Sequence, residues 1–254
     1  SDLELESFDE AQKTYQFAKP SLRLLVIRQL NEPWRWRGDL EINHMSIKSN
    51  SARNSILMHI DPPTAGRNGG LLIQARGALH YDTRNDYSNT SSGVFEELLF
   101  EYGSGKSGRY NGGRMSVGHR HFHALFPNIV IAHHANADVT FGSVPFYESL
   151  TLGGGSTVRG LNASRLQGEG RLLFNTELRW RGINLSRNQH IFMGLLTFAD
   201  IGQIFQRRKG PSLNNWRGGF GLGLRLLWHS TVVRADWGRS GQHTGLYITF
   251  DQVF

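Results

Sequence analysis

The chain has 254 residues and a net charge of +7, from 28 lysines and arginines against 21 acidic residues, and it contains no cysteine. The lack of cysteine excludes a disulfide framework and a thiolate metal site. The sequence contains no run of about 18 apolar residues, so no membrane-spanning helix is predicted. The basic residues are interleaved with acidic ones instead of forming a stripe, so we expect no nucleic-acid partner.

The first 20 residues, SDLELESFDEAQKTYQFAKP, differ from the rest of the chain because they are acidic and contain few apolar residues. They end at Pro20, which favours a boundary at this point. We expect residues 1–20 to form a short N-terminal tail, with a plug inside a barrel lumen as the alternative.

After residue 20, apolar and polar residues alternate with a period of two. In TVVRADWG, for example, Val233, Ala235 and Trp237 share one face, and Arg234 and Asp236 share the other. This alternation predicts strands with one apolar and one polar face. The predicted strands are 22–30, 35–48, 54–62, 70–83, 92–104, 113–125, 127–142, 170–181, 190–205, 217–229, 231–238 and 244–254.

The faces of these strands favour a transmembrane β-barrel over a soluble sandwich. Charges and glycines recur on the polar faces, which suits a narrow, filled lumen, and aromatic residues recur near strand ends, where interfacial girdles lie. Long and short connections also alternate along the chain, as on the two rims of a barrel. We therefore expect an all-β fold, an antiparallel barrel of about 12 strands over residues 21–254. The aromatic residues are Tyr81, Tyr102, Phe126, Phe141, Trp180, Trp228 and Trp237.

The chain ends with GLYITFDQVF, in which the apolar residues again alternate. Leu246, Ile248, Phe250 and Phe254 are predicted to lie on one face. This segment resembles the C-terminal signal by which bacterial outer-membrane proteins are recognised for insertion. The alternative is the last strand of a sandwich.

A glycine-rich connection over residues 143–169 contains PFYESLTLGGGSTVRGLN, and two of the following strands contain NTELRW and LTFADIGQIF. This order resembles the BamA/TamA-like outer-membrane insertase and translocase superfamily, the bacterial surface antigen family, whose sixth loop carries a Val-Arg-Gly-aromatic core. Leu161 stands where that family has an aromatic residue. The positions that match the family pattern are Val158, Arg159, Gly160, Glu177, Phe198 and Asp200.

The chemistry of these residues is consistent with the resemblance. If the polar faces line the lumen, Glu177 and Asp200 lie on adjacent strands and can meet an arginine delivered by an infolded extracellular loop. A planar guanidinium has five donors, so Arg159 can bridge two carboxylates. Glycines around it permit close approach of the backbone. We expect Arg159 to latch the loop inside the barrel.

The resemblance implies a protein of the bacterial outer membrane that inserts or translocates other proteins through a seam between its first and last strands. It implies no cofactor, no metal and no enzymatic activity. The implied partners are outer-membrane lipids and lipopolysaccharide, an unfolded or secreted protein substrate, or an accessory periplasmic protein. The family's periplasmic POTRA domains are not expected in residues 1–20, which would then form a periplasmic tail.

Two other interpretations remain open at this point. A structural or lipid-handling barrel would have the same strand pattern, and an outer-membrane lipase could use Ser156 with a histidine. The histidines of GHRHFHALF lie at alternate positions, which suits a metal site, but imidazoles in a polar lumen need no metal. These histidines are His119, His121 and His123, followed by His133 and His134.

Overall fold

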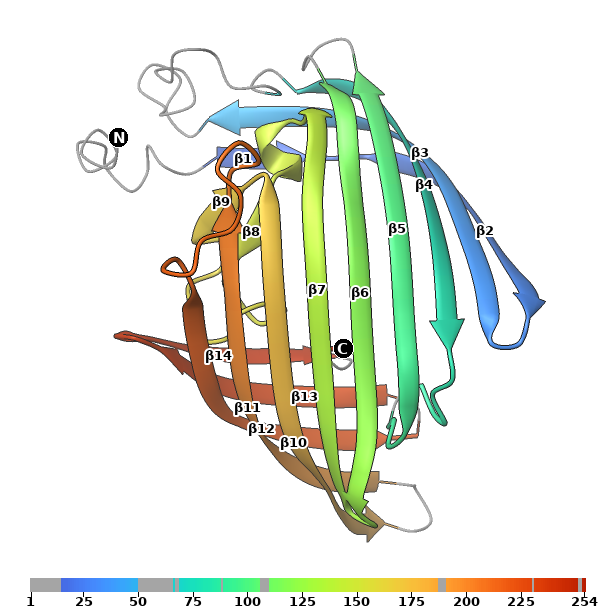
Figure 1. Ribbon diagram of the computed structural model, residues 1–254, viewed down its shortest axis with the longest axis vertical. Coiled ribbons are helices and arrows are strands. Elements are labelled where there is room, and N and C mark those ends of the chain that lie inside the picture. The colour runs from blue at the N-terminus through green and yellow to red at the C-terminus, as the bar shows by residue number, and fades with distance from the viewer. Residues whose placement is uncertain are drawn as a thin grey trace.

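The computed structural model describes residues 15–49, 66, 69–87, 89–105, 110–186, 191–229, 231–250 and 253–254. They form one large, curved antiparallel sheet with a loop on its concave side, here called the lumen (Figure 1). Within these residues no helix is long and apolar enough to cross a membrane. The strands of the sheet are β1 (Tyr15–Ala18), β2 (Ser21–Asn31), β3 (Trp34–Ser49), β4 (Gly70–Asp82), β5 (Gly93–Gly105), β6 (Tyr110–Phe126), β7 (Ile129–Ser143), β10 (Gly170–Ser186), β11 (Ile191–Phe205), β12 (Arg217–Trp228), β13 (Thr231–Ser240) and β14 (His243–Phe250).

The sheet contains twelve strands, and each pairs antiparallel with its neighbour. The prediction of an all-β, antiparallel fold of about 12 strands is therefore confirmed. β1 and β2 both pair with β3, through Ala18 opposite Ser46 and Ser21 opposite Asn43, so they form one interrupted edge strand. The predicted strand 54–62 lies outside the described residues.

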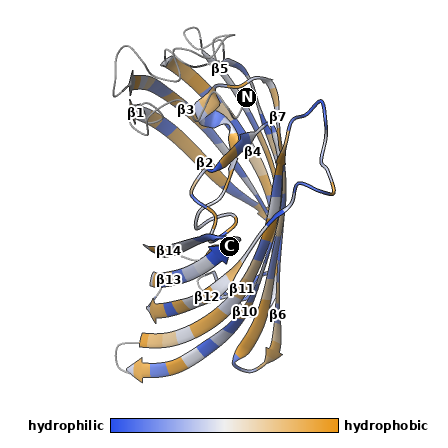
Figure 2. Ribbon diagram, turned by 90° about the vertical axis from the view of Figure 1, so that its left-hand side faces the viewer, coloured by the Kyte–Doolittle hydropathy of each residue, from blue (hydrophilic) through white to orange (hydrophobic). Residues whose placement is uncertain are grey.

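Hydrophobic and hydrophilic residues alternate along the strands (Figure 2), and exposure to the outside alternates with them. On β12, Leu222 points outward and is 62% exposed, whereas on β10 Asn175 points into the lumen and is fully buried. Outward apolar side chains thus form a continuous exposed surface, and inward polar side chains are covered by the loop and by one another. This inverts the usual arrangement of a water-soluble domain, in which large apolar patches are rare.

The two ends of the strands form two rims. The loop rim carries the connections 144–169 and 206–216, and the turn rim carries the tight turn 127–128. The predicted sorting of connections is correct from β4 onward. Strict alternation of the predicted strands would put the first turn, 32–33, on the loop rim; this is wrong, because the turn lies on the turn rim, where Trp34 of β3 is opposite Tyr81 of β4.

Residues 15–20 lie at the loop rim. Tyr15–Ala18, within the predicted tail, pairs with the end of β3, and the Lys19 ammonium lies 3.0 Å from Glu148 Oε1 in the 144–169 connection. Residues 15–20 and this connection therefore share one side of the sheet. An extracellular position for the connection excludes a periplasmic position for residues 15–20.

The described strands leave the sheet open between β2 and β14. β2 pairs with β3, β14 pairs with β13, and no described residue of β2 pairs with β14. Figure 2 shows the resulting curved sheet with the loop crossing its concave side. Within the part of the chain that the structure describes, each edge strand therefore has one row of backbone donors and acceptors that no strand pairs with.

Candidate functional site

The connection between β7 and β10 folds into the lumen. It contains a short 3-10 turn, η2 (Phe146–Glu148), and a two-stranded ladder of β8 (Leu150–Leu152) and β9 (Leu166–Gly168). Leu161, which directly follows Gly160, is 6% exposed in an apolar cluster with Leu152, Val158 and Leu173. Apolar packing therefore holds the base of the loop against the inner face of the sheet.

Arg159, at the tip of this loop, is fully buried among three carboxylates. Its Nε and Nη2 each donate to Asp200 at 2.8 Å, and its Nη1 donates to Glu177 at 2.6 Å and to Asp236 at 3.1 Å. The backbone N–H of Arg159 also donates to Asp200, at 3.0 Å. The exposed fraction of all four side chains is 0%. The structure thus brings together Arg159, Glu177 and Asp200, and adds Asp236.

Other arginines surround the same carboxylates. Arg179 Nε donates to Glu177 at 2.7 Å, Arg225 binds Asp236 through both terminal nitrogens, and Arg234 Nε lies 3.6 Å from Asp236. With Arg159, four positive charges face three negative ones, so the cluster has a formal charge of 4 − 3 = +1. Each buried carboxylate is therefore paired, as burial of an ion requires.

Neutral neighbours complete the pocket around the guanidinium. The Phe198 ring lies under it, with Arg159 Cζ 3.5 Å from the ring centroid, and Asn175 Nδ2 donates to Asp200 at 2.8 Å. Burial alone would lower the pKa of Arg159, but hydrogen bonding to Asp200 and the charges of Glu177, Asp200 and Asp236 hold that pKa above its ordinary value. The arginine is therefore a permanent cation in this pocket.

Two glycines allow the loop tip to reach the sheet. Gly160 has a φ of +90°, and a Cβ on it would lie 2.4 Å from the carbonyl carbon of Arg239. A Cβ on Gly219 of β12 would lie 2.1 Å from the carbonyl oxygen of Arg159. Backbone meets backbone on both sides of the tip, so side chains at these positions would push the loop out of place.

The loop tip also contacts the edge strand β14. Tyr247 Oη accepts a hydrogen bond from the Gly160 N–H at 3.0 Å and donates to the Leu161 carbonyl at 3.3 Å. Arg234 of β13 donates to the Gly155 carbonyl. The loop is therefore fastened to the last strand of the sheet, next to its open edge.

Asp236 and Tyr247 were not among the predicted site residues. Asp236 lies in the alternating segment TVVRADWG, where its inward face was predicted but its partner was not. The sequence feature that could have indicated Asp236 is its position on the inward face of a predicted strand, on the same face as Arg234 and next to the last strand. Tyr247 carries no such signal, because its partners are backbone groups 86 and 87 residues away.

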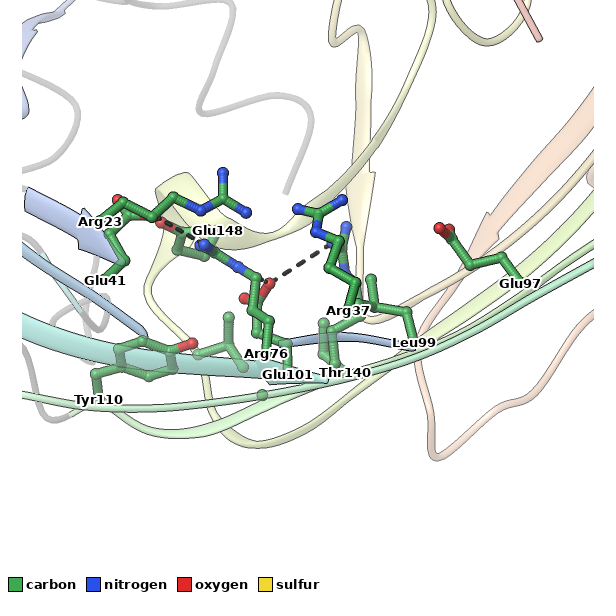
Figure 3. Close-up of a pocket in the computed structure, with 13 residues that line it drawn as sticks. Arg23, Arg37, Glu41, Arg76, Glu97, Leu99, Glu101, Tyr110, Thr140 and Glu148 are labelled. Carbon is green, nitrogen blue, oxygen red and sulfur yellow. Dashed lines mark hydrogen bonds and ion pairs between the residues drawn. The ribbon is translucent and has the colours of Figure 1, made fainter. Parts of the chain in front are cut away.

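A second charged cluster lies on the inner faces of β3, β4 and β5. Arg76 Nη1 donates to Asp39 at 3.0 Å and to Glu41 at 2.7 Å, while its Nε donates to Glu101 at 2.7 Å. Arg76 borders a cavity of about 370 Å³ (Figure 3). Four arginines and four glutamates line this cavity, so their formal charges cancel: Arg23, Arg37, Arg76, Arg114, Glu41, Glu97, Glu101 and Glu148.

The predicted histidine row lies on the outward face. His119, His121 and His123 are exposed on β6, and His121 is directly opposite His133 on β7. His134 points inward and its Nδ1 lies 3.1 Å from Asn175 Oδ1. No three His, Asp or Glu side chains in the described part of the chain are arranged to hold a metal ion.

The C-terminal residues divide between the two faces. Leu246, Ile248 and Phe250 point outward and are 67–77% exposed. Phe254 is 6% exposed, and its ring contacts Phe122, as well as His134 and Arg179, on the inner face. The prediction that Phe254 shares a face with the other three is therefore wrong, because its ring packs in the lumen with the aromatic ring of Phe122 and the guanidinium of Arg179.

The chain matches the family model of the Omp85 superfamily domain over residues 3–244. Its fold is similar to the crystal structure of BamA from Haemophilus ducreyi lacking POTRA domains 1–3, with a TM-score of 0.70, 14% identity, and coverage of 96% of this chain and 56% of that chain. It is also similar to CdiB from Escherichia coli, with a TM-score of 0.64, 16% identity, and coverage of 93% and 45%. The chain thus spans about half the length of these solved structures. A search of curated protein sequences finds no match.

Replacing Arg159 by alanine is expected to lower the free energy of unfolding by about 3–5 kcal/mol, because it leaves buried carboxylates without their central cation. Arg159→Lys is expected to restore little of it, since an ammonium cannot reproduce the bidentate contact with Asp200. Urea unfolding in detergent measures the free energy of unfolding of both variants. The matched control is Arg207→Ala, which removes a half-exposed pair with Glu169 and is expected to cost about 0–1 kcal/mol. Equal losses in the two alanine variants would contradict a buried latch.

Replacing Gly219 by alanine is expected to destabilise the protein by about 1–3 kcal/mol, because the new methyl group collides with the backbone of Arg159. Gly77→Ala on β4 is the control, since nothing lies within 4 Å of a Cβ at that position. Its effect is expected to stay within about 0.5 kcal/mol. The same unfolding measurement compares the two, and a larger loss in Gly77→Ala would show that loop approach does not matter at Gly219.

Proposed function

This chain belongs to the Omp85 superfamily, and on that premise we propose that it inserts or translocates other proteins in the bacterial outer membrane, acting at the gap between β2 and β14. The observation that carries the proposal is the buried contact of Arg159 with Glu177, Asp200 and Asp236, next to the edge strand β14, whose free side has no strand partner among the described residues. The proposal needs no cofactor, since strand pairing supplies the driving interaction.

The edges supply the means of action. An exposed strand edge pairs with an incoming strand through backbone hydrogen bonds, which do not depend on the sequence of the partner. Loop contacts with Asp236 on β13 and Tyr247 on β14 hold this end of the sheet in shape while the edge stays free. In this proposal the latch keeps the edge ready for a substrate strand and the edge performs the pairing.

The outward surface supports a location in the outer membrane, with lipids and lipopolysaccharide as neighbours. Large apolar side chains are exposed across the middle of the sheet. Phe126 and Trp228 lie at the turn rim, and Tyr102 and Phe141 lie toward the loop rim, as interfacial girdles require. We assign the loop rim to the cell exterior, which also places residues 15–20 outside.

The proposed activity is tested with purified protein in liposomes and a urea-unfolded outer-membrane barrel as the substrate. We expect the substrate to fold faster than in empty liposomes, measured by its heat-modifiable band on gels. Arg159→Ala is expected to reduce the acceleration, because the loop no longer holds β13 and β14. A substrate that folds at the same rate with and without the protein would contradict the proposal.

The proposed location predicts that Leu222→Arg lowers the free energy of unfolding in liposomes by about 2–4 kcal/mol, because Leu222 would face the bilayer midplane. Leu213→Arg is the matched control, since Leu213 is 92% exposed in the connection between β11 and β12. Both positions are exposed, so a protein surrounded by water would tolerate both changes. A small effect of Leu222→Arg would therefore argue against a lipid-facing surface.

A further inference from the structure

A cavity of about 520 Å³ lies at the loop rim, beside the tip of the 144–169 connection. Three parts of the chain form its walls: residues 161–166 of that connection, the start of β12 with Trp216 before it, and the turn between β13 and β14. Its volume lies in the range of small-molecule pockets, about 300–1,000 Å³. The cavity is separate from the Arg159 cluster, because none of the charged residues of that cluster lines it.

The two arginines of this cavity have no acidic partner among the residues that the structure describes. Arg165 and Arg217 are exposed, and in the described part of the chain their side chains form no hydrogen bond or ion pair. The described lining residues include no aspartate or glutamate. The cavity beside Arg76 differs, since its four arginines face four glutamates. Arg165 and Arg217 therefore have donors available for an anion.

The rim around the cavity is positively charged. Segments 161–170, 206–218 and 239–243 contain six arginines and lysines and a single acidic residue, Glu169, which pairs with Arg207. Walls of one charge sign focus the electric field in a concave site and raise the local concentration of ligands of the opposite sign. The charge of this rim therefore favours an acidic ligand over a neutral or cationic one.

The two arginines suit a phosphate group. A phosphate monoester carries nearly two negative charges and three strong acceptor oxygens at neutral pH. A guanidinium binds such a group through two parallel hydrogen bonds. One phosphate can therefore accept from both Arg165 and Arg217, whereas a single carboxylate has only two oxygens to share between them.

The other groups in the wall suit a sugar ring. Trp216 is half-buried and offers a flat apolar face and one N–H donor. Gln242 contributes an amide and His243 an imidazole, and each of these side chains has both donor and acceptor capacity. Hydroxyl groups of a sugar need both kinds of partner. The cavity thus combines cations for a phosphate with an aromatic face and mixed hydrogen-bonding groups.

We propose that this cavity binds a phosphorylated saccharide, with Arg165 and Arg217 on the phosphate and Trp216 against the sugar ring. The site goes beyond the proposed insertion or translocation activity and does not depend on it. Two sources share this ligand chemistry, the phosphorylated sugars of lipopolysaccharide and a soluble sugar phosphate. Only the first source depends on the assignment of the loop rim to the cell exterior.

The soluble probe is glucose 6-phosphate, titrated by calorimetry into the full chain in a non-ionic detergent. We expect saturable binding that weakens about tenfold in Arg165→Gln and in Arg217→Gln, because each change removes charge-assisted hydrogen bonds. Arg208→Gln is the matched control, since Arg208 is an exposed cation of the same rim that does not line the cavity. Urea unfolding is expected to be unchanged in all three variants, which shows that they fold.

The role of the sugar ring is tested by comparison with inorganic phosphate. Glucose 6-phosphate is expected to bind more tightly, and Trp216→Leu is expected to remove the difference. Equal affinity of the unchanged chain for both probes, or an equal loss of binding in Arg208→Gln, would overturn the proposal. Tighter binding of hexaglutamate, with the same dependence on Arg165 and Arg217, would overturn it in favour of an acidic protein partner.

The source of the ligand is tested in phosphatidylcholine vesicles with and without lipopolysaccharide. Loss of glucose 6-phosphate binding in the presence of lipopolysaccharide, and its return when the lipopolysaccharide is dephosphorylated, would identify the glycolipid as the ligand. Undiminished binding would identify a soluble sugar phosphate. Arg165→Gln and Arg217→Gln are expected to accelerate substrate folding like the unchanged chain, so failure of this site and failure of the proposed function are distinguishable.

Discussion

The contact of Arg159 with three carboxylates is the interaction on which the rest of the site depends. A guanidinium with no exposed surface is tolerated only when its donors meet anions, and here five donations reach Glu177, Asp200 and Asp236 from side chain and backbone together. Those carboxylates come from β10, β11 and β13, so one loop residue ties three strands. Any change that withdraws the loop leaves several buried charges uncompensated, which is why the loop occupies the lumen.

The loop spans the sheet from one end to the other. Near its start, Glu148 pairs with Lys19, immediately before the edge strand β2, and at its tip Tyr247 of the opposite edge strand holds Gly160. Backbone pairing does not join the two edges in the described residues, so side-chain contacts of the loop connect them instead. Within the described residues, these polar contacts of the loop reach both ends of the sheet.

The two charged clusters of the lumen differ in their access to water. Arg76 retains 14% exposure and borders a cavity of about 370 Å³, whereas Arg159 has none. Ion pairs in contact with water are screened and contribute little, while those in a dry pocket are costly to break. The Arg76 cluster therefore borders a cavity lined by equal numbers of arginines and glutamates, and the Arg159 cluster fixes structure.

Much of the fold follows from the sequence alone. Alternation with a period of two is local, so it revealed the strands and their outward and inward faces, and the order of the loop and strand motifs indicated Arg159, Glu177 and Asp200 together. Only the tertiary structure determined which strands are neighbours. Alternation looks the same whichever way a strand runs, so it could not show that β3 pairs with β4. Asp236 and Tyr247 could not be predicted as site residues for the same reason. Their hydrogen bonds to the loop span 77 and 87 residues and depend on the register of the sheet, which the local sequence pattern does not reveal.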